Sequence, residues 1–484
     1  MNALRLPIIL AGIFLIQHYS SGSPSVSDSS STGMSFRSIT TKNHMVSFSP
    51  DGNILSITSR YQSTKSSPVS SCTFSASQIG SPLLRFFAEA KQPLFTEFKE
   101  TKAPDSGIIA TFSNDTQSIT WRFSPDGYVF SLSGTGVFFQ DSLRITDCKL
   151  VSDNSGGHVR ALSIEKHRVR YSDQTSRSPA IRWFGIRNHF WTLLVKPSDG
   201  MVNVQTDTHP AASVSGICMK QPHQITFYAG PVEFFSLRKA GSECTGLLYP
   251  LWFWMRWLSI GLLMLFTMFL HGTGNCVVSI ILLSLSVKLI LAPLYRIASR
   301  WQKEVNRQRS LLEPRLAEIN KTFKGEEHTN KVLEVHRELD ISPLYALKSL
   351  LSAAIQIPVF FAAYHMLSEH IALSGIPFLW IHDLSIPDHL FALPFSLPWF
   401  GNYFNVLPFV MTSITILTSC IHTDASLSSE LHKRQRNSLL IMATLFFMLL
   451  YTSPAGMLCY WTMNNLFSFF ETSFSALRRK WPDK

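Results

Sequence analysis

A basic residue lies in the middle of a long apolar stretch of this sequence. The segment SIILLSLSVKLILAPLYR, residues 279–296, has the composition of a membrane-spanning helix, yet Lys288 stands near its centre. A charge at that depth costs about 2.5–3.5 kcal/mol on insertion scales. Arg296 lies eight residues further on, which is roughly 12 Å of helix and more than a lysine stem reaches comfortably. Lys288 therefore requires an acidic partner or a water-filled cavity.

Polar residues in the other apolar stretches favour the cavity. No Asp or Glu lies near the centre of these stretches, and Glu471 falls at the end of the last one, which argues against an ion pair. Each polar residue alone more often serves a helix–helix hydrogen bond, but together with Lys288 they predict a hydrated groove. The candidate groove-lining residues are Ser284, one helical turn from Lys288, and Gln356, Thr415, Thr418 and Asn464, the last on a stripe with Tyr460 and Ser468.

Residues suited to bond chemistry are sparse. His382 and Asp383 are the clearest acid–base pair, but sequence neighbours of this kind serve more often as turn and interface residues. The 7 cysteines and 16 histidines are scattered, without the spacing of a metal site. The net charge of +11 comes largely from basic residues between apolar runs, which is typical of cytoplasmic loops and not of nucleic-acid binding.

The elements that position these residues fall into two regions of different composition. Residues 35–245 are polar and alternate in short β-forming runs, with Pro-Asp-Gly turns at 50–52 and 125–127. Such turns between alternating runs are typical of hairpins, and the region is predicted to form an all-β sandwich. Before it, residues 1–20 are interpreted as an N-terminal anchor or signal segment, and residues 21–34 as a Ser-rich linker.

Apolar runs dominate the second region, residues 275–473. Segment 296–348 within it has mixed charges and a break at Lys324-Gly325, which predict a helical hairpin in solvent. The predicted fold is a multi-domain membrane protein with an all-β sandwich, an α-helical bundle of five core helices and an N-terminal anchor or signal. The five predicted spans are 276–295, 349–367, 404–421, 438–452 and 455–472.

Loop charge sets the predicted topology. Segment 296–348 is rich in Lys and Arg, whereas the loop 368–403 contains neither, so the first is expected in the cytoplasm and the second outside. A single crossing before residue 296 agrees with an outer β domain, and for that reason the tryptophan-rich segment 246–274 is interpreted as an interfacial amphipathic helix. The basic tail 474–484 then lies in the cytoplasm, as does the N-terminus.

Several segments resemble those of a known family. AIQIPVFFAAYHML at 354–367, FLWIHDLSIPD at 378–388 and SPAGMLCYWTMNNLFS at 453–468 are similar to signature segments of the YidC/Oxa/Alb family of membrane protein insertases. VKLILAPL at 287–294 resembles the span of that family that carries a basic residue and a following proline. Residues 181–197 and 228–241 more faintly resemble strands of the periplasmic domain of its Gram-negative members.

The resemblance implies an insertase of the bacterial inner membrane, without bond chemistry or cofactor, whose region 35–245 is periplasmic. Lys288 would supply the positive charge of a groove that attracts the acidic segment of an incoming protein, and Tyr460 and Trp461 would contact that substrate. Nascent membrane proteins and the lipid bilayer are the implied partners, with the Sec translocon and the ribosome as candidates. The implied structural prolines are Pro293, Pro358 and Pro454.

Two residues depart from the family pattern. Lys288 stands where the family usually has arginine, so the charge is kept and the planar fork of donors is lost. Trp461 replaces the more usual tyrosine and lacks its hydroxyl. The alternative hypothesis is a solute or ion transporter, with Lys288 binding an anion and Pro358 marking a broken helix, but the spans show no inverted repeat.

Overall fold

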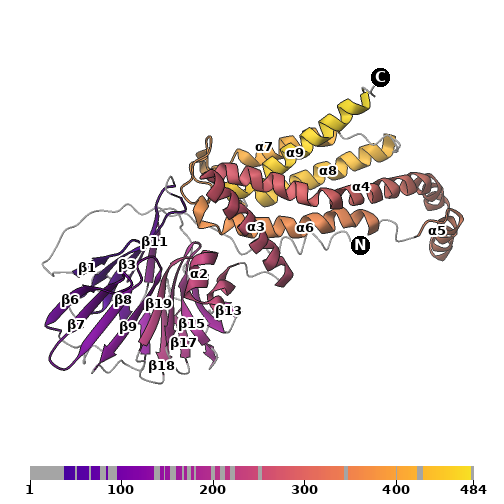
Figure 1. Ribbon diagram of the computed structural model, residues 1–484. Coiled ribbons are helices and arrows are strands. Elements are labelled where there is room, and N and C mark those ends of the chain that lie inside the picture. Colours follow the sequence, from indigo (N-terminus) through magenta and orange to yellow (C-terminus); the bar gives the residue numbers. More distant parts are fainter. Residues whose placement is uncertain are drawn as a thin grey trace. The chain divides into compact units, whose positions relative to one another are not determined.

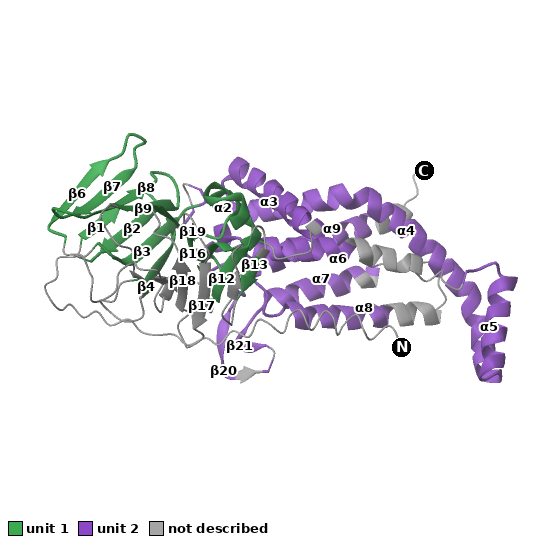
Figure 2. Ribbon diagram, turned by 90° about the horizontal axis from the view of Figure 1, so that it is seen from below, with its two compact units in different colours: residues 1–62, 69–248 green, residues 63–68, 249–484 purple. Residues whose placement is uncertain are grey.

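The chain divides into two units, each described here by itself (Figure 2). Unit 1 comprises Met1–Gln62 and Val69–Leu248, and unit 2 comprises Ser63–Pro68 and Tyr249–Lys484. The predicted segments 1–20 and 21–34 lie outside the described residues. The computed structural model describes residues 37–49, 52–64, 67–76, 83–85, 95–135, 142–145, 148–152, 160–165, 168–171, 176–178, 181–197, 202–207, 213–218, 224–248, 253–342, 347–398, 400–421 and 429–480.

Unit 1 contains three antiparallel sheets (Figure 1). The first has the order β1 (Arg37–Thr40), β2 (His44–Phe48), β3 (Ile54–Tyr61), β4 (Ser70–Ala76), β11 (Cys148–Ser152). The second has the order β14 (Ser176–Ser178), β17 (Val202–Asp207), β18 (Ser213–Cys218), β10 (Ser142–Ile145), β5 (Leu84–Arg85). The third has the order β13 (Arg168–Tyr171), β12 (Arg160–Glu165), β15 (Ile181–Arg187), β16 (Trp191–Pro197), β19 (Gln224–Pro231), β9 (Val129–Thr135), β8 (Ser118–Phe123), β7 (Ile108–Ser113), β6 (Glu97–Lys102).

The strands on either side of each predicted Pro-Asp-Gly turn pair with each other, as predicted. β2 pairs with β3 in antiparallel register, and β8 pairs with β9 in the same way. Along β2 the buried positions are His44, Val46 and Phe48, so every second side chain faces the core. The hairpins form where the sequence alternates because only one face of each strand meets apolar side chains.

Aromatic side chains from the first and third sheets pack face to face to form the core of unit 1. The ring of Phe48 lies 5.4 Å from that of Phe112 and 6.0 Å from that of Trp121. On the third sheet, Phe130 and Phe227 stack at 5.2 Å. Large aromatic rings at these separations bury much apolar area and prefer offset or edge contacts. The predicted β-sandwich is confirmed at this level.

A buried histidine joins the same two sheets. His44 Nε2 lies 2.7 Å from the carbonyl oxygen of Ala229, and Ser59 Oγ donates to that oxygen at 3.0 Å. Burial lowers the pKa of His44 from 6.5 to about 4, although the hydrogen bond to Ala229 opposes the shift. His44 is therefore neutral at physiological pH and donates one ring N–H across the core.

After the sheets, unit 1 ends in the short helix α2 (Phe234–Ala240) and the 3-10 segment η2 (Ser242–Leu247). Unit 2 is largely helical. It contains α3 (Phe253–Thr273), α4 (Cys276–Thr322), α5 (Glu326–Glu338), α6 (Leu347–Ser368), the 3-10 segment η3 (Ile371–Leu373), the hairpin β20 (Phe391–Leu397) and β21 (Gly401–Phe404), α7 (Leu407–Ile421), α8 (Ser429–Leu450) and α9 (Ala455–Lys480).

The helices of unit 2 pack side by side around α4, α6 and α9 (Figure 1). α4 contacts α3, α6 and α9, while α7 packs on both α8 and α9. α4 begins at the N-cap Asn275, whose side chain accepts from the backbone N–H groups of Val277 and Val278. These contacts place α4 and α9, which carry most of the predicted site residues, against each other.

α4 runs for 47 residues without a break, so the predicted span 276–295 and the first arm of the hairpin 296–348 are one helix. The arm turns back after Thr322 at Gly325, whose φ of 70° favours glycine, into α5. Leu312, Ile319, Val335 and Ile341 then form a small apolar core between the two arms. That core explains why the arms pair instead of remaining extended in solvent.

Two described helices are long and apolar enough to cross a membrane, namely Trp254–Thr273 and Cys276–Thr322. The first coincides with α3 and overlaps the segment 246–274, which the sequence suggests is an interfacial helix. α7 and α8 contain shorter apolar runs, Leu407–Thr418 and Arg436–Leu450. The interfacial helix and the core of five spans therefore stay predictions.

Candidate functional site

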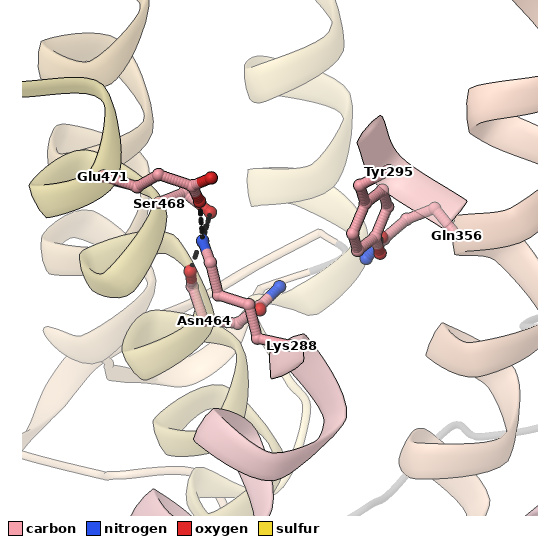
Figure 3. Close-up of polar contacts among 6 residues, drawn as sticks. All are labelled: Lys288, Tyr295, Gln356, Asn464, Ser468 and Glu471. Atoms are coloured by element: carbon pink, nitrogen blue, oxygen red, sulfur yellow. Dashed lines mark hydrogen bonds and ion pairs between the residues drawn. The ribbon is translucent and has the colours of Figure 1, made fainter. Parts of the chain in front are cut away.

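Lys288 points from α4 towards α9, where two polar side chains meet its ammonium (Figure 3). Lys288 Nζ donates to Ser468 Oγ at 2.7 Å and lies 3.1 Å from Glu471 Oε2. Ser468 in turn donates to the backbone carbonyl of Asn464 at 3.0 Å. The lysine side chain is 17% exposed and that of Glu471 is 71% exposed, so the pair joins a largely buried cation to a largely exposed anion.

The expectation that Lys288 has no acidic partner is wrong. Glu471 lies at the end of the predicted span 455–472, far from the centre of that span. α9 in fact continues to Lys480, and its register against α4 brings Glu471 opposite Lys288. Tyr460, Asn464 and Ser468 follow one stripe at helical spacing, and three residues more along that stripe lead to Glu471. The stripe was the sequence signal for this partner.

Ser284 and Tyr460 lie deeper in the same helix pair. Ser284 Oγ donates to the backbone carbonyl of Tyr460 at 3.3 Å, and both residues are buried. The hydroxyl thus joins α4 to α9 one turn from Lys288, in the way small polar residues join helices in membranes. Tyr460 is packed in the core of the helix pair, and its predicted role in contacting substrate stays a prediction.

Gln356 contacts the far end of the α4 span. Its side-chain oxygen accepts a hydrogen bond from the hydroxyl of Tyr295, which lies two turns beyond Lys288 (Figure 3). Gln356 belongs to α6, so this contact ties α6 to α4. Tyr295 was not among the predicted site residues, because a tyrosine at the end of an apolar run usually marks the membrane interface.

The threonines of α7 meet α9 through a neighbour of the predicted asparagine. Asn465, and not Asn464, donates its side-chain N–H to Thr415 Oγ1 at 2.9 Å. Thr415 and Thr418 each donate to a carbonyl one turn earlier in their own helix, at 2.9 Å and 2.7 Å. Both threonines are therefore satisfied locally, and Thr415 also links α7 to α9.

Trp461 packs among aromatic rings from two other helices. Its ring lies edge-on to Phe360 of α6 at 4.8 Å and stacks against Phe446 of α8 at 5.9 Å. A tyrosine ring at this position would fill less of the gap between α6 and α8. The larger indole side chain therefore has a packing reason, and its predicted contact with substrate stays a prediction.

The predicted prolines occupy three different helix positions. Pro293 lies inside α4 and Pro358 inside α6, where each removes one backbone donor, and Pro454 directly precedes α9. The pair His382 and Asp383 forms a turn: Asp383 accepts from both the backbone N–H and the hydroxyl of Ser385 at 2.8 Å. Among the described residues, no group of three or more His, Cys, Asp or Glu could hold a metal ion.

Known proteins resemble the chain most clearly in unit 2. Residues 268–480 match the model of the family described as 60Kd inner membrane protein. Membrane protein insertase YidC of Syntrophobacter fumaroxidans is 29% identical over 248 residues, which cover 51% of this chain and 42% of that protein. Membrane protein insertase YidC of Chlorobium luteolum is 23% identical over 388 residues, covering 75% and 64%.

A solved structure also aligns along most of the chain. It is described as an active YidC insertase with the first transmembrane domain resolved, and it covers 92% of this chain and 93% of its own, at 18% identity and a TM-score of 0.37. The chain spans 42% and 64% of the length of the two relatives named above. Over residues 268–480 the chain is therefore similar to the 60Kd inner membrane protein family, and over about half to three quarters of its length it is similar to these YidC insertases.

Proposed function

We propose that this protein is a membrane protein insertase of the bacterial inner membrane, and that Lys288 supplies the positive charge that attracts the acidic segment of a client. The observation that supports this role is the contact of Lys288 with Ser468 and Glu471 between α4 and α9. A buried ammonium in an apolar helix pair is costly and needs a function or a partner. Here the partner of the Lys288 ammonium is the carboxylate of an exposed side chain, Glu471.

Glu471 acts as a tethered counter-ion that a client carboxylate replaces. Its side chain is 71% exposed and accessible to a client, whereas the lysine side chain is 17% exposed and donates to Ser468. Exchange of one carboxylate for another keeps the ammonium paired at every stage. The desolvation cost of bringing an acidic segment to the membrane is lowered, because its charge meets Lys288.

The remaining features of the proposal follow from the family and from the sequence. Ser284, Gln356, Thr415, Thr418 and Asn464 line a hydrophilic groove among five spanning helices, and clients contact Tyr460 and Trp461. The N- and C-termini lie in the cytoplasm, and residues 35–245 lie in the periplasm. The protein works on nascent membrane proteins, alone or with the Sec translocon and the ribosome, and catalyses no bond chemistry.

Reconstitution in liposomes tests this function. The full-length protein is incorporated into liposomes, and a single-span substrate with an acidic N-terminal tail is added. We expect the tail to become protected from external protease with the wild-type protein and with Lys288→Arg, and protection to fall strongly with Lys288→Ala. Lys42→Ala, which removes an exposed lysine of unit 1, serves as the control and should match wild type.

Two outcomes would contradict the proposal. Full protection of the substrate tail with Lys288→Ala would show that the charge of Lys288 is not needed for insertion. No protection with the wild-type protein, together with a measurable flux of small anions, would instead support the transporter hypothesis. A substrate with a neutral tail separates charge attraction from insertion itself, because its insertion does not require pairing with Lys288.

A further inference from the structure

The hairpin β20–β21, labelled in Figure 2, exposes large apolar side chains, and its sequence contains no Lys, Arg, Asp or Glu. From Leu390 to Phe409 the sequence is LFALPFSLPWFGNYFNVLPF, without a charged residue. Phe391 is 51% exposed and Phe395 is 57% exposed. Isolated exposed apolar residues are ordinary on a protein surface, but an uncharged exposed hairpin invites pairing or adsorption and is usually protected by charge.

Aromatic contacts hold this hairpin against the helices. Phe391 of β20 stacks on Phe404 of β21 at 5.0 Å, and Phe404 stacks on Phe409 of α7 at 5.3 Å. Phe409 in turn packs on Phe447 of α8 at 4.8 Å. A two-stranded hairpin is marginally stable by itself, and this row of rings fixes it at the beginning of α7. Its exposed side chains are therefore held in a defined place beside the helices.

The place of the hairpin beside α7 gives the exposed rings a use. The described part of α7 comprises 15 residues, which correspond to about 22 Å of helix. The hairpin directly precedes α7 and continues its apolar surface, since Phe409 of α7 and Phe391 of β20 are both exposed. Helix and hairpin together present more apolar length to lipid than the helix alone.

The backbone of the hairpin limits how deep it can lie. Among the described residues, β20 and β21 pair only with each other, so the outer edge of each strand has no strand partner there. Backbone N–H and C=O groups at such an edge are not tolerated in the hydrocarbon core but are readily hydrated among headgroups. Aromatic side chains favour the same zone, where one face is apolar and the other wet.

We infer that the β20–β21 hairpin lies in the membrane interface, with Phe391 and Phe395 inserted into the lipid layer at the end of α7. The hairpin is a lipid-binding surface that sets the depth of α7 in the bilayer. This inference concerns a surface distinct from Lys288 and does not depend on insertase activity. Its occupant is lipid, because the exposed rings continue the apolar surface of α7 and aromatic, uncharged segments favour the membrane interface.

Photocrosslinking in bilayers tests the occupant directly. The full-length protein carries p-benzoylphenylalanine in place of Phe391 or of Phe395, which keeps an aromatic ring at each exposed position. It is reconstituted in nanodiscs of phosphatidylethanolamine and phosphatidylglycerol, irradiated and analysed by mass spectrometry. The same photoprobe at Met45, an exposed apolar position of unit 1, is the control.

We expect lipid adducts with the photoprobe at both hairpin positions and few or none with the photoprobe at Met45. Adducts to peptides of this chain, or to a second copy, would overturn the assignment, as would a lipid yield no greater than that of the Met45 control. Phe395→Ser provides a second measurement. It should leave the thermal midpoint in detergent unchanged and increase deuterium uptake of the hairpin in nanodiscs, and unchanged uptake would overturn the inference.

Discussion

The ammonium of Lys288 lies 3.1 Å from the carboxylate of Glu471, and the two side chains differ fourfold in exposure. The lysine side chain is largely buried and donates to Ser468, whereas the glutamate side chain is largely exposed. Lysine offers a compact point charge that one carboxylate can satisfy.

Replacing Glu471 by glutamine removes the anion and keeps the size of the side chain. We expect Glu471→Gln to insert a substrate with an acidic tail faster, because the client carboxylate no longer competes with a tethered one. Partly exposed ion pairs contribute about 0–1 kcal/mol, which limits the gain to about fivefold. The measurement is the initial rate of protease protection in liposomes.

A substrate with a neutral tail is the control for this variant. Its insertion should respond little to Glu471→Gln, since it does not exchange with the carboxylate. Combining Glu471→Gln with Lys288→Ala should abolish the gain. Slower insertion of the acidic substrate by Glu471→Gln alone would show that Glu471 supports the site instead of competing for it.

Local sequence signals predicted the parts of the fold that depend on neighbouring residues. The β2–β3 and β8–β9 hairpins follow from alternation around Pro-Asp-Gly turns. The pairing of β4 with β11, or of β9 with β19, joins strands far apart in the chain and depends on the core as a whole. Long-range pairing of this kind has no local signature, so the order of the sheets could not be predicted.

The same distinction applies to the site. The helix that carries Lys288 is evident from composition, and its polar neighbour Ser284 follows from the helical period. Glu471 depends on the register between α4 and α9, which packing of buried side chains decides. Asn465 was missed for the same reason, since a rotation of one residue along α9 separates it from the predicted Asn464.

Asp388 caps the beginning of α7, and its removal should destabilise unit 2. Its Oδ2 accepts from the backbone N–H groups of Val406 and Leu407 at 2.7 Å and 2.8 Å, and from Trp380 Nε1 at 3.1 Å. Asp388→Ala leaves these donors without that acceptor, at about 1–3 kcal/mol for each buried group. We expect a lower midpoint of thermal unfolding for Asp388→Ala in detergent, measured by circular dichroism.

Asp388→Asn separates the cap from the charge. Its side-chain oxygen can still accept from the helix N–H groups, so the loss should be clearly smaller than with alanine. Equal losses in both variants would mean that the negative charge at the helix N-terminus, and not the hydrogen bonds, provides the stability.

Gly456 lies where α9 meets the loop after α6, and it has no room for a side chain. A Cβ at this position would lie 2.9 Å from Leu373 Cδ1 and 3.1 Å from the carbonyl oxygen of Leu384. The backbone N–H of Gly456 donates to that same oxygen at 2.7 Å, so the loop cannot retreat without losing the bond. Gly456→Ala should therefore destabilise unit 2 by about 1–3 kcal/mol.

Gly261→Ala is the matched control in the same unit. A Cβ at Gly261, inside α3, meets nothing within 4 Å. Because alanine is favoured over glycine inside a helix by about 1 kcal/mol, this variant should be neutral or more stable. Opposite shifts of the thermal midpoint in the two variants are expected, and a neutral Gly456→Ala would contradict the close approach of α9 to the loop.

His44 should make unit 1 sensitive to acid. Its pKa is about 4 in the folded protein, against 6.5 for an ordinary histidine, because it is buried. Between these values the unfolded chain binds a proton that the folded chain does not, so stability falls as the pH decreases through this range. The full stability is present above pH 6.5, and the loss below pH 4 amounts to about 3 kcal/mol.

Deuterium uptake of peptides from β2, β3 and β19 in the full-length protein measures this effect, after correction for the intrinsic pH dependence of exchange. His44→Gln isolates the contribution of His44 from that of other titrating groups, because an amide can donate to Ala229 and does not titrate. Uptake should rise at pH 5 relative to pH 7 in the wild type, and much less in His44→Gln. An equal rise in both proteins would assign the acid sensitivity to other groups. Protonation of His44 would then not be the cause of local unfolding in the sandwich.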